Sequence, residues 1–358
     1  MDILYVGLDG GTSGQRIAAL RRLGHRVTVF DQYRAYPDNK FFRYWHMKTA
    51  LLGLDWLVER YMLSKMRGMS FELVFVDHGD LISPKVIQAF RQAGKVVVNY
   101  NQDDPYSDRD GRRWRIFLKS LPSYDLVVTT KRYRVEEAKT KGAQRVLAVR
   151  SPADELIHRP VELAAGDRAK YNADVVFVGT WMPERGPVLK RLVERGVPLR
   201  IYGERWNKAP EFERLRSHVV MGNLEGVEYA MAISGAKIAL GLLSKGYGDL
   251  HTTRSVEIPA IGTLFCAERT SEHLAMYKDG EEAVFWDDPD DCADKCLALL
   301  ADPEQIRKIA AAGLARVHDN GDFNEILLPK IINEAFRSDS NILAASSRKL
   351  AGSLCGDP

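Results

Sequence analysis

The stretch HTTRSVEIPA, residues 251–260, brings hydroxyl, guanidinium and carboxylate side chains together over a few helical turns. Its pattern predicts a helix whose first turn carries Thr252, Thr253 and Arg254. Free backbone N–H groups, hydroxyls and a guanidinium at a helix N-terminus can converge on a diphosphate. Glu257 lies about one turn further in, where its carboxylate can accept two hydrogen bonds from ribose hydroxyls. The stretch therefore predicts a site for a nucleoside diphosphate.

A second cation follows the strand-like run VVFVG, which ends at Gly179. The segment TWMPERG then brings Arg185 to the start of a helical pattern. An arginine there can donate to the same diphosphate and stabilise the nucleotide as charge develops on it. The alternative is that Arg185 and Arg254 are ordinary solvated surface charges. If both bind the diphosphate, the arrangement requires no metal.

Four acids and a histidine of the first half follow the ends of strand-like runs, where side chains can point into a ligand cleft. These residues are Asp77, His78, Asp80, Asp103 and Asp104. Any of them can hydrogen-bond a hydroxyl or take its proton, and we keep His78, Asp103 and Asp104 as catalytic candidates. A histidine at a strand end is also a common structural hydrogen-bonding residue. Asp104 precedes Pro105, so DDP can equally be a turn.

The glycine-rich stretch VGLDGGTSGQR, residues 6–16, joins the first strand-like run to a helical pattern. A glycine turn before a helix lets the backbone approach an anion, so Gly11 and Thr12 are candidates to face a phosphate. A dinucleotide fingerprint would require glycine in place of Asp9, although Asp31 lies where its ribose-binding acid is expected. No lysine completes a P-loop. A tight turn without a ligand is the remaining alternative.

The elements that must hold these residues alternate between short β-branched runs and stretches of helical period. Runs such as DILYVGL, ELVFVD and KVVVNYN are separated by helical patterns, and the rhythm restarts at ADVVFVG. This alternation predicts an α/β fold with two doubly wound, Rossmann-like domains that face a cleft. The expected division is residues 1–150 for the first domain, 151–172 for a polar linker, 173–325 for the second domain, and 326–358 for a C-terminal helix and tail.

Two motifs of the second half carry a resemblance to a known family. GTWMPERG resembles the glycine and arginine loop, and VEIPAIGTLF the second glutamate and following glycine, of the CgeB-like group of GT-B-fold glycosyltransferases. The likeness extends over most of residues 174–325, and the stretch VDHGDLISPKVIQAFRQAGKVVVNYNQDDPYSD is similar to the group's N-terminal domain. The group is similar to the retaining superfamily whose motif is two glutamates separated by seven residues.

The resemblance implies a metal-independent enzyme without a cofactor that moves a sugar from a nucleoside-diphosphate-sugar donor to a hydroxyl-bearing acceptor. The acceptor, a glycan, a lipid-linked molecule or a small molecule, would bind on the N-terminal side of the cleft. The donor would be held by Gly11, Thr12, Gly179, Arg185, Asp249, Thr252, Thr253, Arg254, Glu257 and Gly262. Two positions depart from the family: Asp249 replaces the first glutamate, and Thr180 replaces an arginine. These departures weaken the retaining assignment most.

Three other interpretations remain open. A nucleotide-sugar epimerase on the same fold would need acid and base groups around the donor's own sugar and no acceptor groove. A non-catalytic sugar-nucleotide or glycan binder would not need the N-terminal acids. A dehydrogenase that binds NAD through the first loop would leave Arg185 and the helix of residues 252–257 without a role.

The composition is that of an ordinary soluble protein, with 45% hydrophobic and 28% charged residues in 358. A net charge of +3, spread along the chain, argues against a nucleic-acid partner. With no leader pattern before the first strand and no run long enough to span a bilayer, we expect a cytoplasmic protein. The four cysteines complete no zinc set, so buried thiols and no metal are expected: Cys266, Cys292, Cys296 and Cys355.

Residues 41–68, FFRYWHMKTALLGLDWLVERYMLSKMRG, interleave aromatic and basic side chains. Their periodicity favours one long helix with its apolar stripe in the core. The alternative is a helix that binds the acceptor or makes peripheral contact with a membrane surface. The small, polar tail after Ser338 is expected to be poorly ordered.

Overall fold

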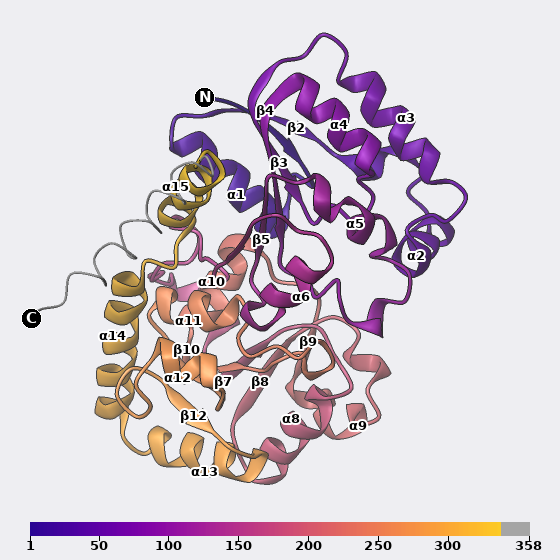
Figure 1. Ribbon diagram of the computed structural model, residues 1–358. Coiled ribbons are helices and arrows are strands. Elements are labelled where there is room, and N and C mark those ends of the chain that lie inside the picture. The colour runs from indigo at the N-terminus through magenta and orange to yellow at the C-terminus, as the bar shows by residue number, and fades with distance from the viewer. Residues whose placement is uncertain (338–358) are drawn as a thin grey trace, which may run out of the picture.

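The computed structural model describes residues 1–337, and within them two six-stranded parallel sheets follow one another along the chain (Figure 1). The first sheet has the order β2-β1-β3-β4-β5-β6 and consists of β1 (Asp2–Val6), β2 (Arg26–Phe30), β3 (Phe71–Asp77), β4 (Gly94–Asn101), β5 (Leu126–Thr129) and β6 (Val146–Ala148). The second has the order β12-β11-β10-β7-β8-β9 and consists of β7 (Ala173–Val178), β8 (Leu199–Gly203), β9 (Val219–Met221), β10 (Ala236–Gly241), β11 (Leu264–Glu268) and β12 (Val284–Trp286). The predicted α/β fold with two doubly wound units is confirmed.

Helices cover both faces of each sheet (Figure 1). Those that precede the second sheet are α1 (Gly11–Arg22), α2 (Lys40–Thr49), α3 (Asp55–Lys65), α4 (Pro84–Ala93), α5 (Arg115–Ser120), α6 (Val135–Thr140) and α7 (Ala165–Tyr171). Those that follow its first strand are α8 (Arg185–Glu194), α9 (Phe212–Leu215), α10 (Gly226–Ser234), α11 (Arg254–Ile261), α12 (Ser271–Met276), α13 (Pro289–Leu300), α14 (Pro303–Asn320) and α15 (Asn324–Ala335). None of the helices within residues 1–337 is long and apolar enough to cross a bilayer.

The strands of the first sheet are buried on both faces because successive side chains point to opposite sides. Leu4 and Val6 join a core beneath α3, α4 and α5. Ile3 and Tyr5 join the core on the other face, which α1 and α15 cover. The near-continuous apolar runs of the sequence follow from this double burial.

The last helix of residues 1–337, α15, crosses back to the first unit. It packs against α1, β4 and β5 and buries Leu328, Ile331 and Ile332 in their shared core (Figure 1). Each of these side chains contributes up to about 2 kcal/mol by leaving water. The Arg145 guanidinium also forms an ion pair with Glu334 at 2.9 Å. The predicted tail after Ser338 lies outside the described residues, as does Cys355.

The prediction of one long helix over residues 41–68 is wrong. The helix breaks after Thr49, where Ala50 and Leu51 adopt left-handed backbone conformations with φ of 50° and 54°. Such conformations cost about 1 to 2 kcal/mol per residue. Both side chains are fully buried, and Arg115 donates to the carbonyl oxygens of Thr49 and Ala50 at 2.8 and 3.0 Å. Burial and these bonds compensate for the strain of the break.

Each sheet has one place where the strand order reverses. In the first sheet this place lies between β1 and β3, and in the second between β7 and β10. The crevice beyond the carboxyl ends of strands at such a switch point is where doubly wound sheets bind ligands. The topology alone therefore predicts two ligand-binding positions, one in each unit.

Candidate functional site

The loops at the carboxyl ends of the two sheets meet each other. The Arg109 guanidinium, after β4, lies against Gly246, and the Tyr133 hydroxyl, after β5, lies near Gly248 of the loop after β10. A cavity of about 550 Å³ opens between the two units. Its lining comes from both: Thr130, Arg132, Tyr133, Val149 and Arg150 from the first, and Leu250, His251, Ser271, Glu272, Ala275 and Met276 from the second.

Two arginines lie together at the switch point of the second sheet. Arg185, the first residue of α8, is 6% exposed and donates to the Thr180 carbonyl at 2.9 Å and the Ser244 hydroxyl at 3.2 Å. Arg254, the first residue of α11, donates to the Val178 carbonyl at 3.0 Å. Within residues 1–337 neither guanidinium forms an ion pair with a carboxylate. Burial, and then the charge of Arg254, lower the pKa of Arg185 to about 10.

Two converging cations that form no ion pair are electrostatically incomplete, because buried charges are normally paired. The N-terminus of α11 adds two donors. The backbone N–H groups of Thr253 and Arg254 have no acceptor among the described residues, whereas Thr252 donates to the Ser255 hydroxyl at 3.1 Å. Thr252 and Thr253 precede the helix and do not lie in its first turn as predicted. The arrangement can bind a phosphate or diphosphate.

Glu257 lies one turn into α11 and is 6% exposed. Its Oε1 is 3.8 Å from Nε2 of His158, and the His158 ring packs edge-on against Tyr229 of α10. Burial, and then the Glu257 carboxylate, raise the pKa of Tyr229. Glu257 forms no ion pair with a lysine or arginine in the described part of the chain. Its carboxylate can therefore accept hydrogen bonds from ligand hydroxyls.

Asp249, which was predicted to bind the donor, is paired with a side chain of the first unit. Its carboxylate forms an ion pair with Lys131, which follows β5 in the first unit. Both side chains are mostly buried. The pair ties the loop between β10 and α11 to the opposite sheet.

Two of the three glycines predicted for the donor site, Gly179 and Gly262, have different surroundings. Gly179 directly follows β7 and lies between the Phe177 ring and the Arg185 guanidinium, with no room for a side chain. Gly262 is the C-cap of α11, with φ of 84°, and packs beside Pro160. The eight residues of α11 span about 12 Å at about 1.5 Å per residue. The left-handed turn accounts for glycine at 262, and the distance argues against the predicted contact with a diphosphate.

A second cavity, of about 680 Å³, opens at the switch point of the first sheet. It is lined by Gly7, Leu8, Ser13, Asp31, Tyr33, Arg34, Tyr36, Asp38, Arg43, His46, Met47, Asp77, His78 and Arg113. Aromatic rings and charged groups of both signs share its wall. This mixture suits a ligand with hydroxyl groups and some apolar surface.

His78 follows β3 in a left-handed conformation, with φ of 60°. Its N–H donates to the Tyr100 carbonyl at 2.8 Å, and the Asn99 amide donates to its carbonyl at 3.1 Å. Its Nδ1 lies 3.2 Å from Oδ1 of Asp77, and its Nε2 lies 3.9 Å from Oδ2 of Asp103. Burial favours the neutral ring, but Asp77 and then Asp103 outweigh it and raise the pKa of His78 to about 9.

The two acids of DDP have different surroundings. Asp103 is partly exposed, and its Oδ2 lies 3.3 Å from the Arg113 guanidinium. Asp104 is 1% exposed, and its Oδ2 accepts from Nε and Nη2 of Arg134 at 3.0 and 2.9 Å. Its Oδ1 accepts from the backbone N–H of Tyr106 at 3.2 Å, which forms a turn. These contacts favour a structural role for Asp104 and leave His78 and Asp103 beside each other.

The sequence led us to expect Asp77 and Asp80 to lie open in a cleft, but both carboxylates are bound within the protein. Asp77 is buried and accepts from Arg16 at 2.7 Å and from the Tyr5 hydroxyl at 2.8 Å. Asp80, also buried, is the centre of a larger network. Its carboxylate faces His46 Nε2 at 2.7 Å, Arg113 Nε at 3.1 Å, the Tyr33 hydroxyl at 3.2 Å and the Gln32 amide at 3.3 Å.

We expect Asp80→Ala to lower the free energy of unfolding of the first unit by about 3 to 5 kcal/mol, because it leaves Arg113 and the other donors without their shared acceptor. Urea unfolding measures this loss. Asp38→Ala is the matched control: Asp38 pairs with Arg43 at 2.7 Å on the exposed rim of the same cavity and should change stability by less than about 1 kcal/mol. Equal effects in the two variants would contradict the role of Asp80.

Gly11 and Thr12 begin α1 at the carboxyl edge of the first sheet, where Gly11 is exposed and Thr12 is half-buried. Gly11 has φ of 53°, and the Thr12 hydroxyl donates to the Gln102 side chain at 3.4 Å. The N-cap, Gly10, offers no side chain to the helix N-terminus. Contact of this loop with a phosphate stays a prediction.

Sequence reasoning missed several residues of these networks, among them Arg16, Arg113, Lys131 and His158. Arg16 could have been found, since it shares the inward face of α1 with Ile17 and Leu20 and so needs a buried acid. The others act on partners from distant segments, and no local pattern marks them.

Comparisons with known proteins agree with this architecture. Residues 185–326 match a family model described as glycosyl transferase-like. No curated protein sequence matches the chain significantly. Among solved structures, sucrose-phosphate synthase from Thermosynechococcus elongatus aligns with 14% identity and a TM-score of 0.65, over 94% of this chain and 99% of that one.

Two further structures show the same likeness. Anabaena HepE in complex with UDP-glucose aligns with 14% identity and a TM-score of 0.64, over 93% of this chain and 98% of that one. A glycosyltransferase from Rickettsia africae aligns with 13% identity and a TM-score of 0.59, over 93% and 97%. At such identities the likeness is one of fold. The chain has the two-domain GT-B glycosyltransferase fold, as predicted.

Proposed function

We propose that the protein is a glycosyltransferase that moves a sugar from a nucleoside-diphosphate sugar to an acceptor hydroxyl between its two units. One observation carries the proposal: Arg185 and Arg254 begin α8 and α11 at the topological switch point, and neither forms an ion pair with an acid of residues 1–337. The family model that covers residues 185–326 supports this, as does the UDP-glucose bound in the similarly folded HepE.

The proposed donor mode follows from α11. The diphosphate binds Arg185, Arg254 and the free N–H groups of the helix, and the ribose hydroxyls donate to Glu257. As the sugar leaves, the guanidinium groups stabilise the negative charge that develops on the nucleotide. Because two cations and a helix end face the phosphates, we propose that no metal or other cofactor is needed.

On the acceptor side, we propose that His78 takes the proton of the attacking hydroxyl. Asp77 holds Nδ1 of the ring, and Nε2 is directed toward Asp103. A base held by a carboxylate on its far nitrogen is a common way to activate a hydroxyl. We place the chain with the CgeB-like group on its motifs, without carrying over the retaining stereochemistry. The acid at the first motif position, Asp249, is paired with Lys131.

The cavity of about 680 Å³ in the first unit, where we propose that the acceptor binds, borders an exposed face of α2. This face carries Phe41 and Tyr44, which are 62% and 68% exposed, beside Lys40 and Lys48, and α2 contains no acid. Met47 joins this face to the cavity wall. We propose that the acceptor is lipid-linked and is taken from an anionic membrane surface, which aromatic and basic side chains bind together.

Co-sedimentation tests this contact. We expect the protein to bind vesicles that contain anionic lipid and not vesicles of phosphatidylcholine alone, and to lose most of this binding in the double variant Phe41→Ser, Tyr44→Ser. Leu274→Ser, at an apolar site on α12 that is 49% exposed, is the control. Equal binding by the double variant, or equal binding to both kinds of vesicle, would contradict the proposal.

A nucleotide-release assay tests the function itself. The protein is offered UDP-, GDP-, dTDP- and CDP-sugars with candidate acceptors in buffer that contains EDTA, and the products are identified by NMR. We expect free nucleoside diphosphate and a new glycosidic bond. An altered sugar still attached to its nucleotide would indicate an epimerase, and binding without any product would indicate a non-catalytic binder.

A further inference from the structure

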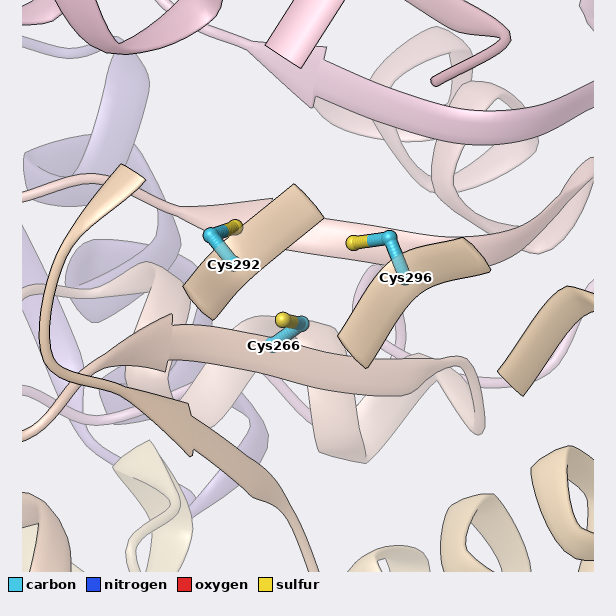
Figure 2. Close-up of side chains that lie close together, drawn as sticks. All are labelled: Cys266, Cys292 and Cys296. Carbon is cyan, nitrogen blue, oxygen red and sulfur yellow. The ribbon is translucent and has the colours of Figure 1, made fainter. Parts of the chain in front are cut away.

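Three of the four cysteines of the chain come together inside the second unit (Figure 2). Cys266 belongs to β11, while Cys292 and Cys296 lie one turn apart on α13. Their sulfur atoms all lie within 4.8 Å of one another, and Figure 2 shows them directed toward one another between the strand and the helix. The expected burial of these thiols is confirmed, but their convergence was not predicted.

The cluster lies in an apolar environment. The three side chains are fully buried in a core that also contains Leu264 and Trp286. Burial in this core removes the solvent that would stabilise charge on the sulfur atoms. A net negative charge in this place would be costly.

This cost decides which ion the cluster can hold. Three thiolates around a monovalent or divalent ion leave a net negative charge in the core, whereas three thiolates around a trivalent ion leave none. Structural zinc also requires a fourth ligand. No histidine, aspartate or glutamate in residues 1–337 joins the three sulfur atoms.

We propose that Cys266, Cys292 and Cys296 form a binding site for trivalent arsenic, taken up as uncharged arsenous acid. Three S–H bonds and three As–O bonds break, three As–S bonds form, and the three hydroxyl groups leave as water with the thiol protons. No electron is transferred, and the bound centre is neutral. The arsenic atom links β11 to α13 and stabilises the folded second unit by mass action. This site is independent of the proposed sugar transfer.

Native mass spectrometry of the full chain with arsenite, kept reduced with a phosphine, tests the site. We expect a mass increase of one arsenic atom less three hydrogen atoms, three sulfur neighbours by X-ray absorption, and a higher urea midpoint. Uptake should be slow, since α13 must open to admit the ligand. Incubation with Zn²⁺ at the same concentration should give no stoichiometric complex.

Variants make the test specific. Cys296→Ala, and independently Cys292→Ala, should lose the complex while their circular dichroism stays that of the wild type. Cys355→Ala should keep it. The proposal is overturned if the folded wild type takes up no arsenic at equilibrium, if both cluster variants bind it as well as the wild type does, or if Zn²⁺ occupies the cluster in its place.

Discussion

Arg254→Gln is expected to weaken the binding of UDP by about 10- to 150-fold while leaving the empty protein about as stable as the wild type. The loss corresponds to about 1.5 to 3 kcal/mol for hydrogen bonds to a charged group. In the empty protein Arg254 loses one bond, to the Val178 carbonyl, but its removal relieves the repulsion that lowers the pKa of Arg185. Isothermal titration with UDP and urea unfolding measure the two effects separately.

The matched control for this prediction is Arg191→Gln. Arg191 lies on α8, the helix that Arg185 begins, but it is exposed and pairs with Asp290. Its replacement should leave UDP binding unchanged. If a folded Arg254→Gln variant binds UDP as tightly as the wild type, the result would contradict binding of the diphosphate at Arg254.

His78→Gln is expected to lower kcat by about 10² to 10⁴, the usual contribution of a positioned base, with little change in the affinity for UDP. The wild-type rate should also show a pH dependence. Burial favours the neutral ring, but Asp77 and Asp103 raise its pKa to about 9, so only about one ring in a hundred is neutral at pH 7. The rate should rise about tenfold per pH unit toward pH 9 and level off above it.

Asp104→Asn is the comparison for this prediction, because Arg134 and a turn hold Asp104 away from the catalytic pair. It should keep most of the wild-type kcat if the loop stays folded. If His78→Gln keeps full activity, or if the wild-type rate does not depend on pH between 7 and 9, the proton leaves by another route. Transfer to the departing phosphate would then be the better mechanism, and it would agree with a retaining outcome.

Much of the fold could be predicted because its signals are local. The apolar runs mark strands buried on both faces, and the helical stretches between them require parallel sheets. Arg185 and Arg254 could be predicted as candidates because each begins a helix next to a recognisable motif. The break after Thr49 was missed, since it depends on Arg115, which is distant in the sequence.

The acidic residues show where sequence reasoning ends. Asp77, Asp80, Asp103 and Asp104 all follow strands, and nothing local separates them. Their surroundings are set by three arginines from other segments, Arg16, Arg113 and Arg134. Asp77, Asp80 and Asp104 are buried beside them, and Asp103 stays partly exposed. Asp249 resembled a ligand-binding acid in the sequence, and Lys131 of the other unit changes its surroundings.

The central claim is that a nucleoside diphosphate binds at Arg185 and Arg254 without a metal. The most direct measurement is the thermal stability of the protein with UDP, GDP, dTDP, CDP and NAD, each with magnesium and with EDTA. A ligand at a hundred times its Kd adds about 2.7 kcal/mol to the folded state. We predict stabilisation by at least one nucleoside diphosphate that is equal in EDTA and magnesium. Stabilisation by NAD alone, or only with magnesium, would contradict the account.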